Sequence, residues 1–166
     1  MDYIYIGKIV NTHGIKGELR IISNFEYKEL VFQKDVNIYI GNKYQKEKIV
    51  TYRHHKNYEM ITLYGYNNIN DVLKFKNNKV YVCRNEFNSL KDKILKSDII
   101  GMSAFLEEQE IGIVTDIYST GNNYEVFEIM NGNTKKLIPY HNDFIQSIDK
   151  DKKIIIFKGG IVWCWR

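Results

Sequence analysis

Short stretches rich in β-branched and aromatic residues, separated by turn residues, fill the first 84 positions of the chain. Such stretches are typical of strands, and several of them at regular spacing favour a small barrel. A short helix over residues 71–75, capped by Asn70, is expected before the last strand. We therefore predict a barrel over residues 1–84, with strands at 3–10, 18–22, 36–40, 44–52, 60–64 and 79–83.

The pattern breaks at residues 85–93, which are polar and show no regular alternation. A second series of strand-like stretches follows, at 112–118, 124–129, 135–139, 144–148 and 153–157. Turn signals separate these stretches, at Gly121 with Asn122 and at Asn131 with Gly132. We predict a mainly β protein with two small barrels in tandem, over 1–84 and 94–166, joined by a linker at 85–93.

The connection between the first two strands combines glycine with positive charge. Gly14 and Gly17 stand three apart in this loop, and glycine permits a sharp turn or a positive φ. Lys16 lies between the two glycines and Arg20 follows shortly after them. We expect a shaped, basic loop that is presented on a scaffold of sheet.

Three other interpretations of this loop compete. The first is a plain hairpin loop without function, since glycine marks turns more often than sites. The second is a phosphate-binding loop, although the spacing of neither common glycine motif is present. The third is the GxxG loop of a KH domain, which clamps nucleic-acid backbone. The flanking residues are β-branched and extended, whereas a KH loop joins helices.

Charge is distributed unevenly along the chain. Residues 1–88 hold 14 Lys and Arg against 9 Asp and Glu, and residues 89–166 hold 10 against 11. A basic half beside a nearly neutral half favours two kinds of partner, with a polyanion near the first. The apolar fraction of 44% is sufficient for a packed core.

The sequence does not predict export or membrane insertion. Asp2, Gly7 and Lys8 interrupt the first apolar stretch, which therefore lacks the organisation of a signal peptide. No apolar run approaches the roughly 18 residues of a membrane-spanning helix. Cys83 and Cys164 are far apart and form no CxxC motif, which favours buried thiols in a reducing cytoplasm.

Few residues suggest chemistry. Asp143, Asp149 and Asp151 are close in sequence, and paired carboxylates can act in acid–base catalysis, but charged residues around a solvated turn are the simpler interpretation. His54 and His55 are adjacent, their side chains are expected to diverge, and no further metal ligands follow at a familiar spacing. No serine or cysteine has an evident base and orienting partner. We predict a protein that is not an enzyme and has no metal and no cofactor.

The first half resembles the N-terminal domain of the RimM family of bacterial ribosome maturation factors. Residues 52–56 and 65–82 are similar to the later part of that domain. The resemblance implies a six-stranded barrel related to a domain of translation factors. The matching residues of the first stretch are Gly7, Lys8, Ile9, His13, Gly14, Lys16, Gly17, Glu18 and Arg20.

The second half resembles the PRC barrel, which is the usual C-terminal domain of RimM. The two resemblances follow each other in the family's order and together span nearly the whole chain. The matching residues are Asp98, Ile99, Ile100, Gly101, Gly112, Ile113, Val114, Gly121, Asn122, Val126, Leu137, Ile138, Pro139, Phe144, Ile145 and Asp149.

The resemblance implies a protein that binds the free small ribosomal subunit, assists assembly of its head region and promotes processing of the precursor ribosomal RNA. It implies contact with the nineteenth small-subunit ribosomal protein, with ribosomal RNA nearby and no membrane, and we expect a cytoplasmic monomer. For ribosome or RNA contacts we predict His13, Lys16 and Arg20, with Arg53 and Lys56 as weaker candidates.

One position departs from the family pattern. The family usually has a tyrosine pair before the segment that begins at Asp98, and this chain has Ile94 and Leu95 there. We predict that these two side chains form a partly exposed apolar patch that docks on a protein. The alternative is that they close the bottom of the second barrel. The tail over 159–166 is also unusual for the family.

Two other functions stay open at this point. One is a plain RNA-binding barrel without a role in assembly, and the other is a small β-barrel enzyme. Only the assembly function requires co-migration with free small ribosomal subunits, so a ribosome gradient distinguishes it from the others.

Overall fold

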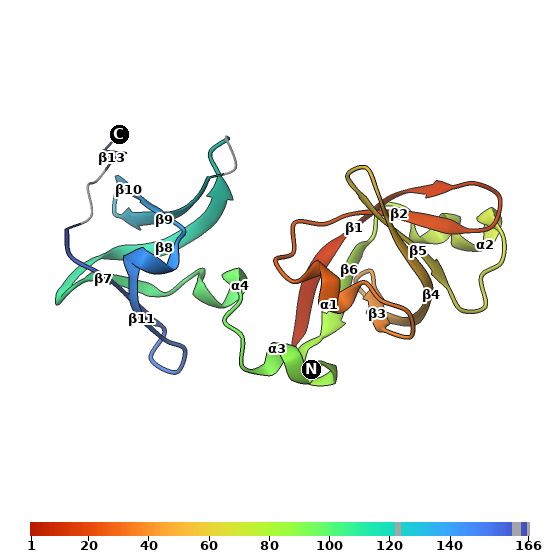
Figure 1. Cartoon of the computed structure of the whole chain (residues 1–166), viewed down its shortest axis with the longest axis horizontal. Helices are drawn as coiled ribbons and strands as arrows, with labels where there is room; N and C mark the ends of the chain where they lie inside the picture. The colour runs from red at the N-terminus through yellow and green to blue at the C-terminus, as the bar shows by residue number, and fades with distance from the viewer. Residues whose placement is uncertain (122–123, 161–163, 166) are drawn as a thin grey trace. The chain divides into compact units, whose positions relative to one another are not determined.

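The computed structural model describes residues 1–121, 124–160 and 164–165. The chain forms two compact units, Met1–Lys93 and Ile94–Arg166, and strands dominate in each (Figure 1). The prediction of a mainly β protein with two β units in tandem is confirmed.

Six strands of the first unit close into a barrel, in the order β1-β2-β5-β4-β3-β6. All neighbouring strands are antiparallel, and β6 pairs with both β1 and β3, so the ring has no free edge. The predicted six-stranded barrel is confirmed. Its strands are β1 (Tyr3–His13), β2 (Glu18–Ile22), β3 (Asn37–Ile40), β4 (Gln45–His55), β5 (Tyr58–Leu63) and β6 (Lys79–Cys83).

Alternation along β1 shows how the barrel is filled. Ile4, Ile6 and Ile9 are buried, whereas Tyr5 and Lys8 between them are exposed. The register of β1 shifts once against β6 and once against β2, which marks bulges. Bulges increase the bend and twist of a strand, and this curvature lets β1 pair on both sides of the closed sheet.

Residues 53–57, a basic stretch between the predicted strands 44–52 and 60–64, were expected to connect them, but they are largely strand. Arg53, His54 and His55 belong to β4 and pair with residues of β5. Only Lys56 and Asn57 form the turn, and Lys56 has a φ of 54°. A two-residue hairpin turn with positive φ matches the twist of its strands, which explains why the strand pairing continues to the end of the basic stretch.

Residues 85–93, which were expected to be a linker, contain short helical turns. They include part of η2 (Arg84–Glu86) and all of α3 (Asn88–Lys91), and the side chain of Leu90 is fully buried. The segment groups with the first unit. Because the residues around Leu90 are polar, the sequence pattern did not indicate that this one side chain would be buried. The domain boundaries themselves stay a prediction.

Seven strands of the second unit form one sheet, in the order β11-β12-β7-β8-β9-β10-β13. The pair β12 and β7 is parallel, and the other neighbours are antiparallel. The sequence analysis missed β7, whose four residues are too few to show alternation. The strands are β7 (Ser103–Leu106), β8 (Gln109–Ser119), β9 (Glu125–Asn131), β10 (Thr134–Pro139), β11 (Ile145–Asp149), β12 (Ile154–Phe157) and β13 (Cys164–Trp165).

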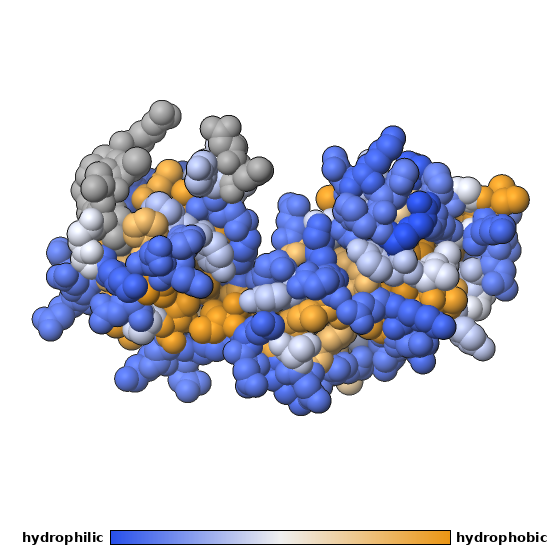
Figure 2. Space-filling view, in the orientation of Figure 1, coloured by the Kyte–Doolittle hydropathy of each residue, from blue (hydrophilic) through white to orange (hydrophobic). Residues whose placement is uncertain are grey.

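Apolar side chains from most of these strands form the core of the second unit. On the face of the molecule drawn in Figure 2, hydrophilic residues cover most of the surface of each unit, and hydrophobic residues show between them. The buried cluster of the second unit comprises Ile99, Met102, Ala104, Ile111, Val114, Phe127, Ile129, Ile138, Ile155 and Phe157.

The remaining helical segments are short. They are α1 (Lys28–Val31), α2 (Ile69–Val72), η1 (Leu73–Phe75), α4 (Lys96–Ile99) and η3 (Asn142–Phe144). No helix in the described part of the chain is long and apolar enough to cross a membrane.

Some residues that carry a sequence-based expectation are not described by the structure. Asn122 of the predicted turn, and residues 161–163 and 166 of the tail, lie outside the described residues. Within the tail, the backbone of β13 pairs with Lys136 and Leu137 of β10. Cys83 is a buried, free thiol, as predicted for that residue.

Candidate functional site

The loop between β1 and β2 has the conformation that its glycines permit. Gly14 has a φ of 64° and Gly17 a φ of 78°. A Cβ atom on Gly17 would stand 2.9 Å from the carbonyl oxygen of Asn68, so the loop passes very close to that backbone. The amide of Ile69 donates to the carbonyl of Ile15 at 3.0 Å. The glycine prediction is confirmed, and the loop is anchored on the start of α2.

The anchor for this loop is itself well formed. The side chain of Asn68 accepts hydrogen bonds from the amides of Asn70 and Asp71 and so caps α2. The prediction that Asn70 caps this helix is therefore wrong, because the cap is Asn68. Because Asn68 satisfies the free amides of the helix start, the segment beside Gly17 has a defined conformation.

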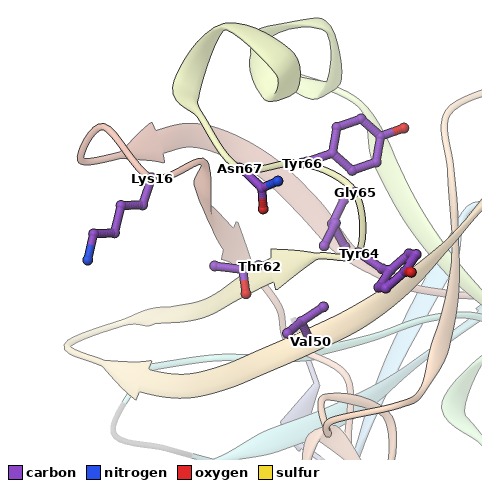
Figure 3. A pocket seen from close by; sticks show the side chains of 8 residues that line it. Lys16, Val50, Thr62, Tyr64, Gly65, Tyr66 and Asn67 are labelled. Atoms are coloured by element: carbon purple, nitrogen blue, oxygen red, sulfur yellow. The ribbon is translucent and has the colours of Figure 1, made fainter.

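Lys16 lies beside a surface pocket with a volume of about 690 Å³. In Figure 3, Thr62 on β5 and Val50 on β4 border this pocket below, and Tyr64 and Tyr66 follow β5 on the other side. Tyr64 is 74% exposed. Lys16 is exposed and has no ion-pair partner among the described residues. The loop thus presents an uncompensated cation at one edge of the pocket, and the exposed ring of Tyr64 lies at the opposite edge.

His13 and Arg20 lie together on β1 and β2. Nη2 of Arg20 is 2.6 Å from Nδ1 of His13, and the guanidinium carbon lies 5.6 Å from the ring centroid of Tyr58. Nε of Arg20 is buried and has no hydrogen-bond partner in the described part of the chain. Arg20 is therefore held against Tyr58, with part of its donor capacity unused.

Arg53 is already engaged by a carboxylate. Its Nε and Nη2 donate to the two carboxylate oxygens of Glu18, each at 2.7 Å. The hydrogen bonds from Arg53 hold the pKa of Glu18 below its usual value. Because this bidentate pair compensates the charge of Arg53, that side chain is a poorer phosphate ligand than Lys16.

Lys56 lies at the tip of the β4–β5 hairpin. It is exposed and borders a second pocket of about 570 Å³, which His54, Asn57 and Tyr58 also line. The structure therefore places His13 and Arg20 on the neighbouring strands β1 and β2, and Arg53 on β4, which β5 separates from β2. Lys16 and Lys56 occupy two separate turns. The role of all five in binding stays a prediction.

Glu59 is a buried carboxylate that the sequence analysis missed. It is 1% exposed and lies opposite Ile21, on the side of β5 that also carries the buried Ile61 and Leu63. Tyr52 donates to it at 2.7 Å, Lys28 of α1 pairs with it at 3.0 Å, and Nδ1 of His54 lies at 3.2 Å. The alternation along β5 was the available signal, because it places residue 59 on the core side.

The partners of Glu59 decide its charge. Burial raises the pKa of the Glu59 carboxyl, but the hydrogen bonds from Tyr52, Lys28 and His54 outweigh burial and leave the pKa below its usual value. Burial and the neighbouring Glu59 raise the pKa of Tyr52 to about 12. Glu59 is thus an ionised group that ties α1 and β4 to β5.

Ile94 and Leu95, the predicted protein-docking pair, differ in burial. Leu95 is 1% exposed, so the expectation of a partly exposed patch is wrong for this residue. Ile94 is partly buried and packs against the core cluster of the second unit. The alternative, that these side chains help to complete the core, accounts better for Leu95. A docking role for the pair stays a prediction.

The described residues contain no group of three or more His, Cys, Asp or Glu side chains that could hold a metal ion. His54 contacts Glu59, and the nearby carboxylates of the second unit pair locally, Asp143 with His141 and Asp149 with Lys152. These contacts match the expected solvated turns rather than an acid–base pair.

A closed barrel that carries an uncompensated basic loop, followed by a second β unit, defines a tandem β-barrel protein with a cationic surface on its first unit. The family models agree with both units. The RimM N-terminal domain matches residues 4–87, and the RimM PRC barrel domain matches residues 96–159.

Curated relatives lead to the same family. A ribosome maturation factor RimM of an Exiguobacterium species is 37% identical over 161 residues, which cover 94% of this chain and 93% of that protein. Those of Staphylococcus haemolyticus and Bacillus cereus are 36% and 34% identical over 157 residues each. These cover 92% and 90% of this chain. The chain belongs to the RimM family of ribosome maturation factors.

Proposed function

We propose that this protein binds the free small ribosomal subunit, assists assembly of the subunit's head region and promotes processing of the small-subunit precursor RNA. The observation that carries this proposal is the presence of both RimM domains, in order, over residues 4–87 and 96–159. The exposed, uncompensated Lys16 in its anchored loop supports it, because such a cation can contact the phosphates of ribosomal RNA.

The proposed mechanism is binding rather than catalysis. A protein that binds one arrangement of RNA and protein more tightly than others shifts the population toward that arrangement. Lys16 and Lys56 would contribute phosphate contacts from their turns, and Arg20 and His13 would contribute from the barrel wall. In this proposal the protein is not an enzyme, needs no cofactor, and acts in the cytoplasm as a monomer.

The proposed protein partner is the nineteenth small-subunit ribosomal protein. Residues 89–166 carry nearly balanced charge, 10 Lys and Arg against 11 Asp and Glu, which suits a protein surface better than a polyanion. We place this contact on the second unit and the RNA contacts on the first.

Sedimentation of the tagged protein through a ribosome gradient tests the proposal. We expect the protein to co-migrate with free small subunits and to be absent from complete ribosomes. Protein that stays at the top of the gradient under low salt overturns the proposal. Migration with every RNA-containing fraction would favour a plain RNA-binding barrel, and turnover of a small substrate without particle binding would favour a small β-barrel enzyme.

A further inference from the structure

A continuous group of tyrosines covers one outer side of the barrel, away from the basic loop. It comprises Tyr3 and Tyr5 on β1, Tyr39 on β3, Tyr44 in the turn before β4, and Tyr81 on β6, and we call it the tyrosine face. Tyr81 stands opposite both Tyr5 and Tyr39 in the strand register. Figure 1 shows β1, β6 and β3 in the same part of the barrel.

The rings of the tyrosine face touch one another in sequence across the strands. Ring centroids are 5.9 Å apart for Tyr5 and Tyr81, 5.0 Å for Tyr81 and Tyr44, and 4.9 Å for Tyr3 and Tyr39. Tyr3 and Tyr44 stack with a centroid distance of 4.1 Å and an interplanar angle of 6°. These contacts restrain the rings, so little side-chain entropy remains to be lost when a ligand binds.

The barrel core accounts for Tyr39, which is 5% exposed, but not for the exposed rings of Tyr5 and Tyr44. The core is filled from the other side of the same strands, where Ile4, Val80 and Val82 are buried. Tyr5 is 52% exposed and Tyr44 is 38% exposed. The tyrosine face therefore presents aromatic surface to solvent while its neighbours hold it in place, which is the arrangement of a stacking platform.

Two lysines lie beside this platform. Lys8 on β1 and Lys79 on β6 are directly opposite in the register, and both are exposed. Nζ of Lys79 is 5.9 Å from the ring centroid of Tyr5. Neither lysine has an ion-pair partner among the residues that the structure describes. Like charges directly opposite each other destabilise a sheet, and a bound anion would remove that cost.

The third nearby lysine provides a contrast. Lys46 pairs with Glu86 at 3.2 Å, and Glu86 also accepts from Tyr39 at 2.6 Å. The barrel thus supplies a carboxylate for Lys46 and none for Lys8 and Lys79. The uncompensated charges of Lys8 and Lys79 therefore lie beside Tyr5, which at 52% is the most exposed ring of the tyrosine face.

We infer that the tyrosine face with Lys8 and Lys79 binds unpaired RNA, with a base stacked on Tyr5 and the adjoining phosphate between the two lysines. Tyr81 lies two positions after Lys79 on β6, a distance of about 7 Å, so a ring and a cation lie within reach of one nucleotide. Every base has a flat face, whereas bases inside a helix have that face covered by their neighbours.

Charge separates this ligand from a protein. An aromatic patch alone also suits a protein partner, but a pair of opposed, uncompensated lysines favours a phosphate backbone. The inference depends on the proposed function only for the source of the RNA, which would be a stretch of precursor ribosomal RNA that has not yet paired. Binding of a purified oligonucleotide and binding of the subunit can therefore fail independently.

The test measures the binding of a fluorescein-labelled, unstructured oligoribonucleotide to the purified full chain by anisotropy, over a series of salt concentrations. Tyr5→Ala should weaken binding about 5- to 150-fold, the range for loss of one stacked base, and Tyr5→Phe should retain it. Replacing Lys8 and Lys79 by Ala should lower the salt slope by about 0.7, because the one single-strand phosphate between them is no longer neutralised.

A matched control is available at Tyr124, which is 72% exposed and lies in the second unit, outside the tyrosine face and the Lys16 pocket. Tyr124→Ala should leave oligonucleotide affinity unchanged. The two exposed lysines do not fill the core, so their replacement keeps the test valid even if Tyr5→Ala unfolds. Equal losses for Tyr5→Ala and Tyr124→Ala, an unchanged salt slope without the lysines, or equal affinity for double-stranded RNA would overturn the inference. So would a Tyr5→Ala variant that binds RNA normally but loses a protein partner.

Discussion

Arg53 on β4 donates hydrogen bonds to both carboxylate oxygens of Glu18 on β2, at 2.7 Å each. Because β5 lies between these strands, the pair joins β4 to β2 on the outer side of the barrel. The pair divides the basic residues of this region into two groups. Arg53 is compensated within the fold, whereas Lys16 in the adjoining loop has no ion-pair partner among the described residues. The two cations should therefore respond differently in a binding assay.

Lys16→Ala should weaken binding of the small-subunit particle and lower the salt slope by about 0.7 to 0.9, because one phosphate contact is lost. Arg53→Ala should change the slope less, since its charge is already paired. Filter binding over a salt series measures both, and Lys34→Ala, at an exposed lysine in another part of the barrel, serves as the control. An affinity for Lys16→Ala equal to that of Lys34→Ala at low salt contradicts the assignment.

Gly17→Ala should destabilise the protein more than Gly14→Ala. Both positions have positive φ, which costs a residue with a side chain about 1–2 kcal/mol. Only at Gly17 would the new Cβ also stand 2.9 Å from the carbonyl oxygen of Asn68, while Gly14 has open space. Urea unfolding of the two variants checks this order. Equal midpoints would mean that the loop is not anchored on Asn68.

Glu59 should contribute a pH-dependent part of the stability. Its pKa in the folded protein is below the usual value of 4.5, so the unfolded chain binds the proton more readily. The contribution is complete above about pH 4.5 and is lost as pH falls through the lowered pKa of the folded protein. Glu59→Gln should cost about 1–3 kcal/mol at neutral pH, from weakened hydrogen bonds to a charged group.

Thermal unfolding of the wild type and Glu59→Gln at pH 7 and at acidic pH tests this linkage. The gap between the two melting temperatures should narrow as the pH falls. Glu47→Gln is the control, because Glu47 lies on the same β4 strand as His54 but is not part of the Glu59 cluster. A gap that stays constant through the acidic range would show that Glu59 is not ionised in the folded protein.

Leu95→Ser should lower the melting temperature strongly, since removal of a fully buried leucine costs about 2–5 kcal/mol. Ile94→Ser should cost less, because Ile94 is only partly buried. If Ile94 also docks on a protein, its serine variant should lose particle binding at temperatures where it remains folded. Normal binding by a folded Ile94→Ser variant places the docking surface elsewhere.

The strands with the clearest local signals were predictable from the sequence. The predicted stretches 18–22 and 79–83 coincide with β2 and β6, because glycine or paired asparagine residues bound these short runs. The strand β7 could not be found, since four residues next to Asp98 and Gly101 show no period. It pairs with β8 on one side and with β12, some 50 residues later, on the other, and no local pattern encodes the second pairing.

The candidate site was predictable in outline only. The glycines at 14 and 17 indicated a shaped loop, and its conformation follows from them. The compensation of Arg53 by Glu18 depends on β5 lying between β2 and β4, which is a property of the barrel order. The tyrosine face was hidden for the same reason, since its members come from four separate stretches that meet only when β3 and β6 pair.

The parallel pairing of β7 with β12 has a consequence for the order in which the chain folds during its own synthesis. The barrel of the first unit has all of its strands once Cys83 has been made, so it can close while the remainder is still being translated. Strand β7 can pair with β8 directly after it, but its other edge must wait until residues 154–157 have emerged, because its parallel neighbour lies there. A nascent chain stalled before residue 154 would therefore leave one edge of β7 unpaired, and that edge would need protection from aggregation.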